Sequence, residues 1–242
     1  MKQPQIIAHR GASGYRPENT LAAFSLALEM GVDGLELDVQ MTRDGHIIVC
    51  HDEQVDRTTN GSGWIKDMTL EEIKALDAGS WFNKAYQGEK IPTLREVLDL
   101  VKGLPLLMNI ELKNGPIQYP GLEEKTIAQL KEFQMEKLAI LSSFNHYSLL
   151  EVKKVDPQIK TGILYMAGLV DPWVYARYVG AQSIHPYLYS VVPSMVKGAI
   201  ENHFTVYPFT VNEEIHMKHL FHMGVTGMIT NYPDRARKLL EG

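Results

Sequence analysis

The chain has 242 residues and a formal net charge of −5, from 24 basic and 29 acidic side chains. Hydrophobic residues make up 45% of the sequence and charged residues 22%, which excludes a disordered tail, a collagen-like chain and a disulfide scaffold. The single cysteine, Cys50, has no partner for an internal disulfide. Acidic side chains outnumber basic ones, and the sequence has no run of basic residues, which argues against nucleic acid as a partner.

The beginning of the sequence contains no long apolar region of the kind that a secretory signal requires. No apolar stretch approaches the roughly 18 residues of a membrane span. We therefore expect a cytoplasmic protein without an integral membrane segment.

Short apolar runs alternate with amphipathic segments along the chain. The runs are rich in Ile, Val and Leu and have the length of strands buried on both faces of a parallel sheet. Eight such strands, each followed by a helix, predict a (β/α)8 TIM barrel over residues 1–242, with a doubly wound open sheet as the alternative. Asn19 is the expected N-cap of the first helix. The predicted strands are 5–9, 34–41, 106–113, 138–144, 161–165, 183–187, 205–211 and 227–230, and the predicted helices are 20–30, 93–101, 122–133, 147–155, 172–179, 193–201, 213–222 and 233–240.

One segment departs from this alternation. After the second predicted strand, a turn at 42–46 leads into the alternating run 47–51, and residues 52–90 then lack the strand–helix rhythm. Loops of this length in a compact domain are functional or carry structure of their own. We expect residues 52–90 to form a small inserted segment of the barrel domain rather than a linker.

Charged and apolar side chains alternate on two of the predicted strands. Glu36 and Asp38 lie two residues apart and therefore project to the same side, and Glu111 and Lys113 repeat this pattern. Burying a charge costs several kcal/mol unless it is paired or bound to a metal. Three carboxylates against one lysine leave an excess of negative charge, which Mg²⁺ or Ca²⁺ would cancel. The alternative is a buried ion-pair network that includes Arg10.

Two histidines stand at the ends of elements near these acids. His9 ends the first predicted strand and His51 ends the run that follows the turn. Because imidazole titrates near neutrality, one histidine can accept a proton while the other supplies one to a leaving oxygen. Arg10 and Lys113 are candidate phosphate contacts. Aromatic residues near strand ends, Phe209 among them, either pack in the core or line a small-molecule pocket.

In combination these residues resemble the glycerophosphodiester phosphodiesterase family. The likeness runs over nearly the whole chain and rests on a long, ordered set of motifs. They are His9-Arg10-Gly11, Pro17-Glu18-Asn19-Thr20, Glu36-Leu37-Asp38-Val39, His51-Asp52, Asn109-Ile110-Glu111-Leu112-Lys113, Ser143-Phe144 and Asn231-Tyr232-Pro233.

The resemblance implies a TIM barrel whose insertion, 52–90, covers the glycerol end of a glycerophosphodiester. It implies hydrolysis of this small-molecule substrate to sn-glycerol 3-phosphate and an alcohol, with one divalent cation, Ca²⁺ or Mg²⁺. Asp52 would orient the preceding histidine or support the insertion. Phe209 stands where many members have tryptophan, which bears on the choice of alcohol. The implied site residues are His9 and His51 as the acid and base, Glu36, Asp38 and Glu111 on the metal, and Arg10, Lys113 and Phe209 on the substrate.

Three other functions compete with this one. A phospholipase acting on phosphatidylinositol or sphingomyelin would share the barrel and the two histidines. A barrel lyase would use Lys113 as a Schiff-base amine, although neighbouring carboxylates favour its protonated form. A non-catalytic module would bind phosphodiesters without turning them over.

Overall fold

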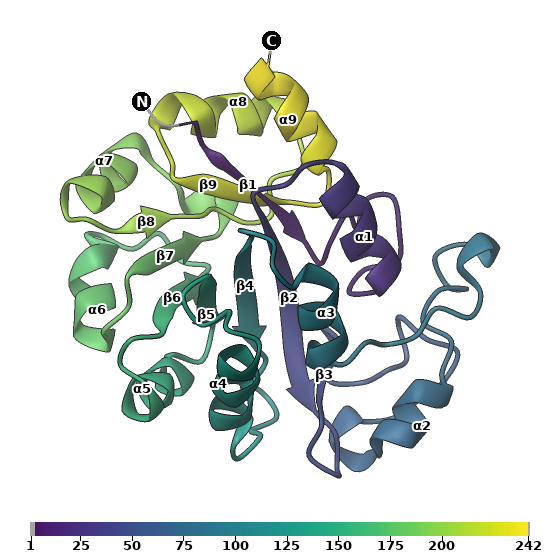
Figure 1. The fold of residues 1–242 in the computed structure, drawn as a ribbon. Coiled ribbons are helices and arrows are strands. Elements are labelled where there is room, and N and C mark those ends of the chain that lie inside the picture. The colour runs from purple at the N-terminus through teal and green to yellow at the C-terminus, as the bar shows by residue number, and fades with distance from the viewer. Residues whose placement is uncertain (1–2, 242) are drawn as a thin grey trace.

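In residues 3–241, which the computed structural model describes, nine strands form one sheet in the order β8-β7-β6-β5-β4-β2-β1-β9, with β3 beside β2. Neighbours along this order are parallel, and β3 is antiparallel to β2. The sheet curls into a nearly closed barrel with helices around its outside (Figure 1). The predicted TIM barrel is therefore confirmed. The strands are β1 (Gln5–His9), β2 (Gly34–Met41), β3 (Ile47–Val49), β4 (Leu107–Leu112), β5 (Ala139–Ser143), β6 (Lys160–Tyr165), β7 (Ser183–Pro186), β8 (Thr205–Val206) and β9 (Gly227–Thr230).

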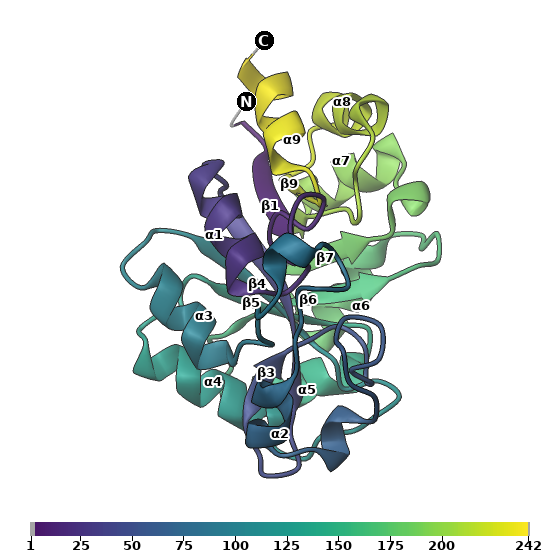
Figure 2. The same ribbon diagram turned by 90° about the vertical axis from the view of Figure 1, so that its right-hand side faces the viewer.

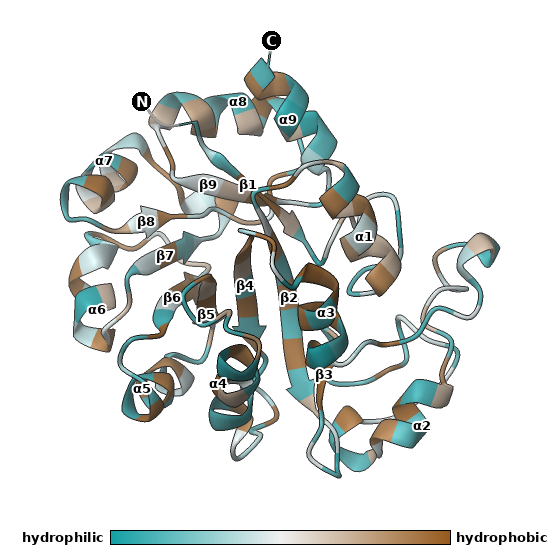
Figure 3. Cartoon of the chain, viewed as in Figure 1, coloured by the Kyte–Doolittle hydropathy of each residue, from teal (hydrophilic) through white to brown (hydrophobic). Residues whose placement is uncertain are grey.

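The helices alternate with the strands as a (β/α)8 barrel requires. Within residues 3–241, none of them is long and apolar enough to cross a membrane. Colouring by hydropathy shows brown and teal sides on individual helices, as expected where one side packs on the barrel (Figure 3). The helices are α1 (Leu21–Glu29), α2 (Leu70–Ala75), α3 (Leu94–Val101), α4 (Leu122–Glu132), α5 (His146–Val155), α6 (Pro172–Val179), α7 (Pro193–Glu201), α8 (Glu214–Met223) and α9 (Pro233–Glu241), with short 3₁₀ turns η1 (Ile65–Asp67), η2 (Lys84–Tyr86) and η3 (Leu188–Ser190).

The seventh barrel strand, β8, is much shorter than the predicted 205–211. β8 ends at Val206, because Pro208 lacks the N–H that would continue a regular ladder. Irregular backbone closes the barrel instead. The N–H of Ile229 donates to the Pro208 carbonyl at 3.0 Å, and the N–H of Val211 donates to the Ile229 carbonyl at 2.9 Å.

The predicted N-cap of the first helix is wrong by one residue. Thr20 caps α1, since its hydroxyl accepts from the N–H of Ala23 at 3.2 Å. Asn19 instead takes a left-handed backbone conformation, with φ of 56°. Its side chain is thereby free to donate to Asp38 on β2 at 2.9 Å. Asn19 therefore contacts the barrel interior instead of capping the helix.

The segment between β3 and α3 stands apart from the ring of helices (Figures 1 and 2). It carries η1, α2 and η2, and α2 begins with a reciprocal capping box between Thr69 and Glu72. The segment also has a small apolar cluster of its own, joined to the barrel through Ile48 of β3. Its buried members are Ile48, Cys50, Val55, Ile65, Ile73, Ala78 and Ile91.

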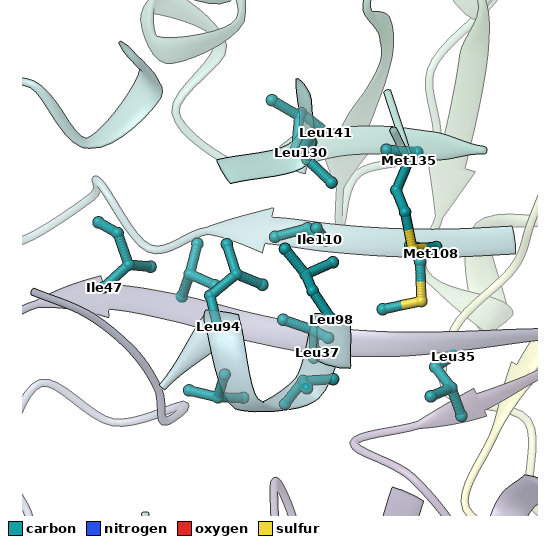
Figure 4. Packing of buried hydrophobic residues seen from close by; sticks show 14 of the residues in the cluster. Leu35, Leu37, Ile47, Leu94, Leu98, Met108, Ile110, Leu130, Met135 and Leu141 are labelled. Carbon is teal, nitrogen blue, oxygen red and sulfur yellow. The ribbon is translucent and has the colours of Figure 1, made fainter. Parts of the chain in front are cut away.

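The main core lies between the strands and the surrounding helices. Leu94 and Leu98 of α3 lie against Leu37 of β2 and Ile110 of β4 (Figure 4). Leu37 and Ile110 alternate with Glu36, Asp38 and Glu111 along their strands, so packing the apolar side of each strand outward turns the carboxylates into the barrel.

The barrel interior also holds a buried histidine, His185 on β7, which is 1% exposed. Its Nε2 lies 2.7 Å from the Ser183 hydroxyl. The ring occupies space left by Gly162 on β6, where an added Cβ would come within 2.7 Å of His185 Nε2. Burial lowers the pKa of His185 to about 3.

Replacing Leu98 with alanine is expected to lower the free energy of unfolding by about 3 kcal/mol, because a fully buried side chain is lost and a cavity remains. Urea unfolding followed by circular dichroism measures the change. Leu104→Ala is the matched control, since that side chain is 41% exposed, and it should cost under about 1 kcal/mol. Equal losses in the two variants would contradict the packing described.

His185 makes unfolding easier in mild acid. Its imidazole takes up a proton in the unfolded chain near pH 6.5 but only near pH 3 when folded, so this contribution to stability is present above pH 6.5 and is lost as the pH falls. Between pH 7 and 5 the free energy of unfolding of the wild type should fall by about 2 kcal/mol more than that of His185→Gln. His219→Gln, on the exposed side of α8, is the control for removing an imidazole. If the free energy of unfolding of the wild type and of His185→Gln fell by the same amount between pH 7 and 5, the prediction would be refuted.

Candidate active site

Three buried carboxylates meet inside the barrel near the carboxyl ends of β2 and β4. Glu36 and Asp38 lie two residues apart on β2, and Glu111 pairs in register with Asp38 across the β2–β4 ladder. One carboxylate oxygen from each residue lies within 4.8 Å of the other two. Alternation along the strands predicted the shared side, and the register brings the two strands' acids together.

The three carboxylates strongly affect one another's protonation. Burial and the neighbouring Asp38 raise the pKa of Glu36 well above its ordinary value, and burial also raises the pKa of Glu111. Burial acts in the same direction on Asp38, but Arg10 and Lys113 outweigh it and hold the pKa of Asp38 below its ordinary value. Without a bound cation, burial thus favours the neutral forms of Glu36 and Glu111.

This cluster fits a hard divalent cation. The Oδ1 of Asp38 is buried and accepts no hydrogen bond from any residue in 3–241. The nearest cationic group recorded for it, Lys113 Nζ, is 3.9 Å away. A set of carboxylate oxygens with an unsatisfied buried acceptor suits Mg²⁺ or Ca²⁺ better than zinc.

Two cations flank the carboxylates. The Arg10 Nε is 3.2 Å from Asp38 Oδ2, and Lys113 Nζ donates to Glu111 Oε1 at 2.9 Å. Burial lowers the pKa of Lys113, but Glu111 and Asp38 outweigh it and the net pKa is raised. A protonated amine is not a nucleophile, so these contacts disfavour a Schiff-base lyase.

The backbone after β1 turns sharply to bring Arg10 into the site. Arg10 itself has φ of 55°, and Gly11 follows with φ of 78°. A Cβ on Gly11 would lie 2.6 Å from the Ala23 carbonyl carbon, so this turn requires glycine. The N–H of Arg10 then donates to Glu36 Oε2 at 2.9 Å.

His9 has a neutral partner. Its Nδ1 lies 2.6 Å from the side-chain oxygen of Asn231, and its Nε2 lies 3.9 Å from Glu36 Oε2. An amide oxygen only accepts, so this contact assigns the proton to Nδ1 and leaves Nε2 with a free electron pair. Burial and the Arg10 charge lower the pKa of His9 to about 4.

His51 has a charged partner. Its Nδ1 lies 2.6 Å from Asp52 Oδ1. Gln40, the next inward residue of β2 after Asp38, holds this segment through its Nε2, which lies 3.1 Å from the His51 carbonyl oxygen and 2.5 Å from that of Asp52. The partner of His51 is thus a carboxylate, whereas the partner of His9 is a neutral amide.

The substrate-wall candidate, Phe209, borders a cavity of about 20 Å³ beside the carboxylates. Its ring centroid lies 5.7 Å from that of Phe144 and 6.2 Å from that of Tyr187. The other lining residues of the cavity are His9, Glu36, Asn109, Glu111, Leu164 and Ile229.

Three supporting residues were not predicted in these roles. Asn19 was assigned to a helix cap, although it stands in the motif that carried the resemblance. Gln40 continues the alternation that selected Glu36 and Asp38, so the period of two would have found it. Asn231 is 222 residues from His9, and no local pattern indicates their contact.

Comparison with known proteins agrees with this geometry. The sequence profile of the glycerophosphoryl diester phosphodiesterase family matches residues 9–235. The chain belongs to this family. It is 52% identical over 235 residues to a glycerophosphodiester phosphodiesterase of Caldanaerobacter subterraneus subsp. tengcongensis, with 97% of each chain covered. The predicted activity class, glycerophosphodiester phosphodiesterase, is therefore confirmed.

Solved structures of the family have the same fold. A phosphodiesterase from Oleispira antarctica, in complex with the product sn-glycerol-3-phosphate, aligns with a TM-score of 0.89 at 33% identity, covering 99% of this chain and 98% of that one. A glycerophosphodiester phosphodiesterase from Agrobacterium tumefaciens aligns with a TM-score of 0.86 at 27% identity, covering 97% and 99%.

Glu36→Gln is expected to stabilise the protein in EDTA by about 1 kcal/mol, because it removes a buried carboxyl group that is costly to ionise while keeping an acceptor for the Arg10 N–H. Mg²⁺ or Ca²⁺ should raise the Tm of the wild type but not of this variant. Thermal unfolding with and without each ion tests both statements. Glu132→Gln, on the exposed side of α4, is the control, and an ion response retained in Glu36→Gln would contradict the assigned ligands.

Proposed function

We propose that this phosphodiesterase hydrolyses glycerophosphodiesters to sn-glycerol 3-phosphate and an alcohol, with one divalent cation and two histidines. The observation that carries the proposal is the buried cluster of Glu36, Asp38 and Glu111 between two imidazoles with different partners. The product bound by the Oleispira antarctica relative supports the identity of the phosphorylated product.

Glu36, Asp38 and Glu111 would hold the cation, Mg²⁺ or Ca²⁺. When bound, such an ion polarises the phosphodiester and offsets charge on its oxygens in the transition state. Arg10 and Lys113 contact the phosphate oxygens from the two sides of the cluster. Phe209 forms an apolar wall for the organic part of the substrate, and without an indole N–H it offers no hydrogen bond to an alcohol.

The two histidines divide the proton transfers between them. His9 is the base, since its Nδ1 proton is held by Asn231 and its Nε2 is free to accept a proton from the nucleophile. His51 is the acid, since its Nδ1 lies 2.6 Å from the Asp52 carboxylate, which orients the ring, and it protonates the departing alcohol oxygen. The nucleophile is water or a hydroxyl of the substrate's own glycerol, the second route passing through a cyclic phosphate.

Purified protein incubated with glycerophosphocholine should release glycerol 3-phosphate, lose this activity in EDTA and regain it with Mg²⁺ or Ca²⁺. His9→Gln should lower kcat at least about 100-fold, because a general base contributes that much or more. An enzyme-coupled assay for glycerol 3-phosphate gives both rates. Full activity in EDTA would refute the metal requirement, and binding without release would favour a non-catalytic module.

A further inference from the structure

Arg57 lies in the segment that follows β3 and joins two carboxylates from different parts of the chain. Its Nε and Nη2 lie 2.6 and 3.1 Å from the two oxygens of Asp52. Its Nη1 and Nη2 lie 2.8 and 2.7 Å from the two oxygens of Glu18, which precedes α1. Both sides of the planar guanidinium are therefore occupied by bidentate pairs.

Each of these carboxylates also holds a residue of the active site. Asp52 Oδ1 accepts from His51 Nδ1 at 2.6 Å, and Glu18 Oε1 accepts from Arg10 Nη1 at 2.8 Å. A continuous series of contacts thus runs from the carboxylate cluster to the second histidine, with charges of alternating sign from Asp38 to Asp52. The members in order are Asp38, Arg10, Glu18, Arg57, Asp52 and His51.

Arg57 differs in two respects from an ordinary surface ion pair. Its side chain is 45% exposed, but Glu18 is only 14% exposed, so one end of the contact is screened from solvent. Arg43, in the neighbouring turn, makes a single 3.5 Å contact with an exposed carboxylate of Glu72. Isolated, exposed ion pairs such as that of Arg43 with Glu72 contribute little to stability. A planar guanidinium that is paired with a carboxylate on both sides fixes the orientation of both carboxylates.

We propose that Arg57 is a positioning residue that sets His51 and Arg10 in one rigid frame, so that the acid and the phosphate contact face the same substrate. The inference rests on the proposed function, because it assumes that His51 protonates the leaving oxygen. Arg57 does not touch the reacting atoms. It acts through Asp52 on the histidine and through Glu18 on Arg10.

This role has a signature that a general loss of structure lacks. A choline alkoxide is a poor leaving group and needs a proton from the acid, whereas p-nitrophenolate departs without one. A mispositioned His51 therefore slows release of choline far more than release of p-nitrophenol. Local unfolding would slow both substrates by the same factor.

The test compares Arg57→Gln with the wild type on glycerophosphocholine and on the p-nitrophenyl ester of sn-glycerol 3-phosphate. For glycerophosphocholine we expect kcat to fall about 100-fold, and for the aryl ester by less than about 10-fold. KM should rise for both substrates, since Arg10 loses its support. His51→Gln removes the acid itself, so the difference between its losses on the two substrates is the largest that Arg57→Gln could show.

Two further variants complete the design. Arg57→Lys keeps one positive charge without the fork and should recover part of the choline rate, which also covers the case in which Arg57→Gln folds poorly. Arg95→Gln is the matched control, because Arg95 makes a bidentate pair with Glu132 on the α3–α4 surface and should leave both substrates unaffected.

Equal losses on the two substrates, or wild-type kinetics in Arg57→Gln, would overturn the proposal. A wild-type enzyme that releases glycerol 3-phosphate from neither substrate would instead refute the proposed function, and this inference would fall with it. A selective loss of choline release together with a higher KM would support it.

Discussion

The concentration of negative charge inside the barrel is the constraint on which the rest of the site depends. Glu36, Asp38 and Glu111 stand where apolar packing on the outer side of β2 and β4 directs them, and burial makes each carboxylate costly to ionise. Neighbouring positive charge offsets this cost. Arg10 and Lys113 supply positive charge, and a divalent cation would supply the remainder.

The two histidines near this cluster differ in the partners of their Nδ1 atoms. His9 lies beside the cluster with its Nδ1 on a neutral amide, while His51 stands at the base of the inserted segment with its Nδ1 on a carboxylate. In the proposed function, these different partners would prepare two chemically identical side chains for opposite proton transfers. The partner of His9 comes from the far end of the chain, because the barrel brings β9 back beside β1, whereas the partner of His51 is the next residue.

Much of this arrangement could be predicted from local sequence, and the limits have physical reasons. Alternation along a strand identifies Glu36, Asp38 and Glu111, since side-chain direction in a strand is fixed by position. It fails for β8, where Pro208 interrupts a run that is apolar enough to be a strand. Asn19 was misassigned because its residue type suits a helix cap equally well. Asn231 and Arg57 act through contacts set by the closed barrel and by the inserted segment, which no local pattern encodes.

The placement of His51 has an evolutionary consequence. The three buried carboxylates and His9 belong to the barrel, whereas the segment that follows His51 packs largely on a small core of its own. Sequence change in that segment can therefore be accommodated without disturbing the carboxylates. Its freedom to diverge ends at Asp52 and Arg57, where the segment is tied to the barrel. A lineage acquiring new substrates is expected to vary the outer turns and keep these two residues.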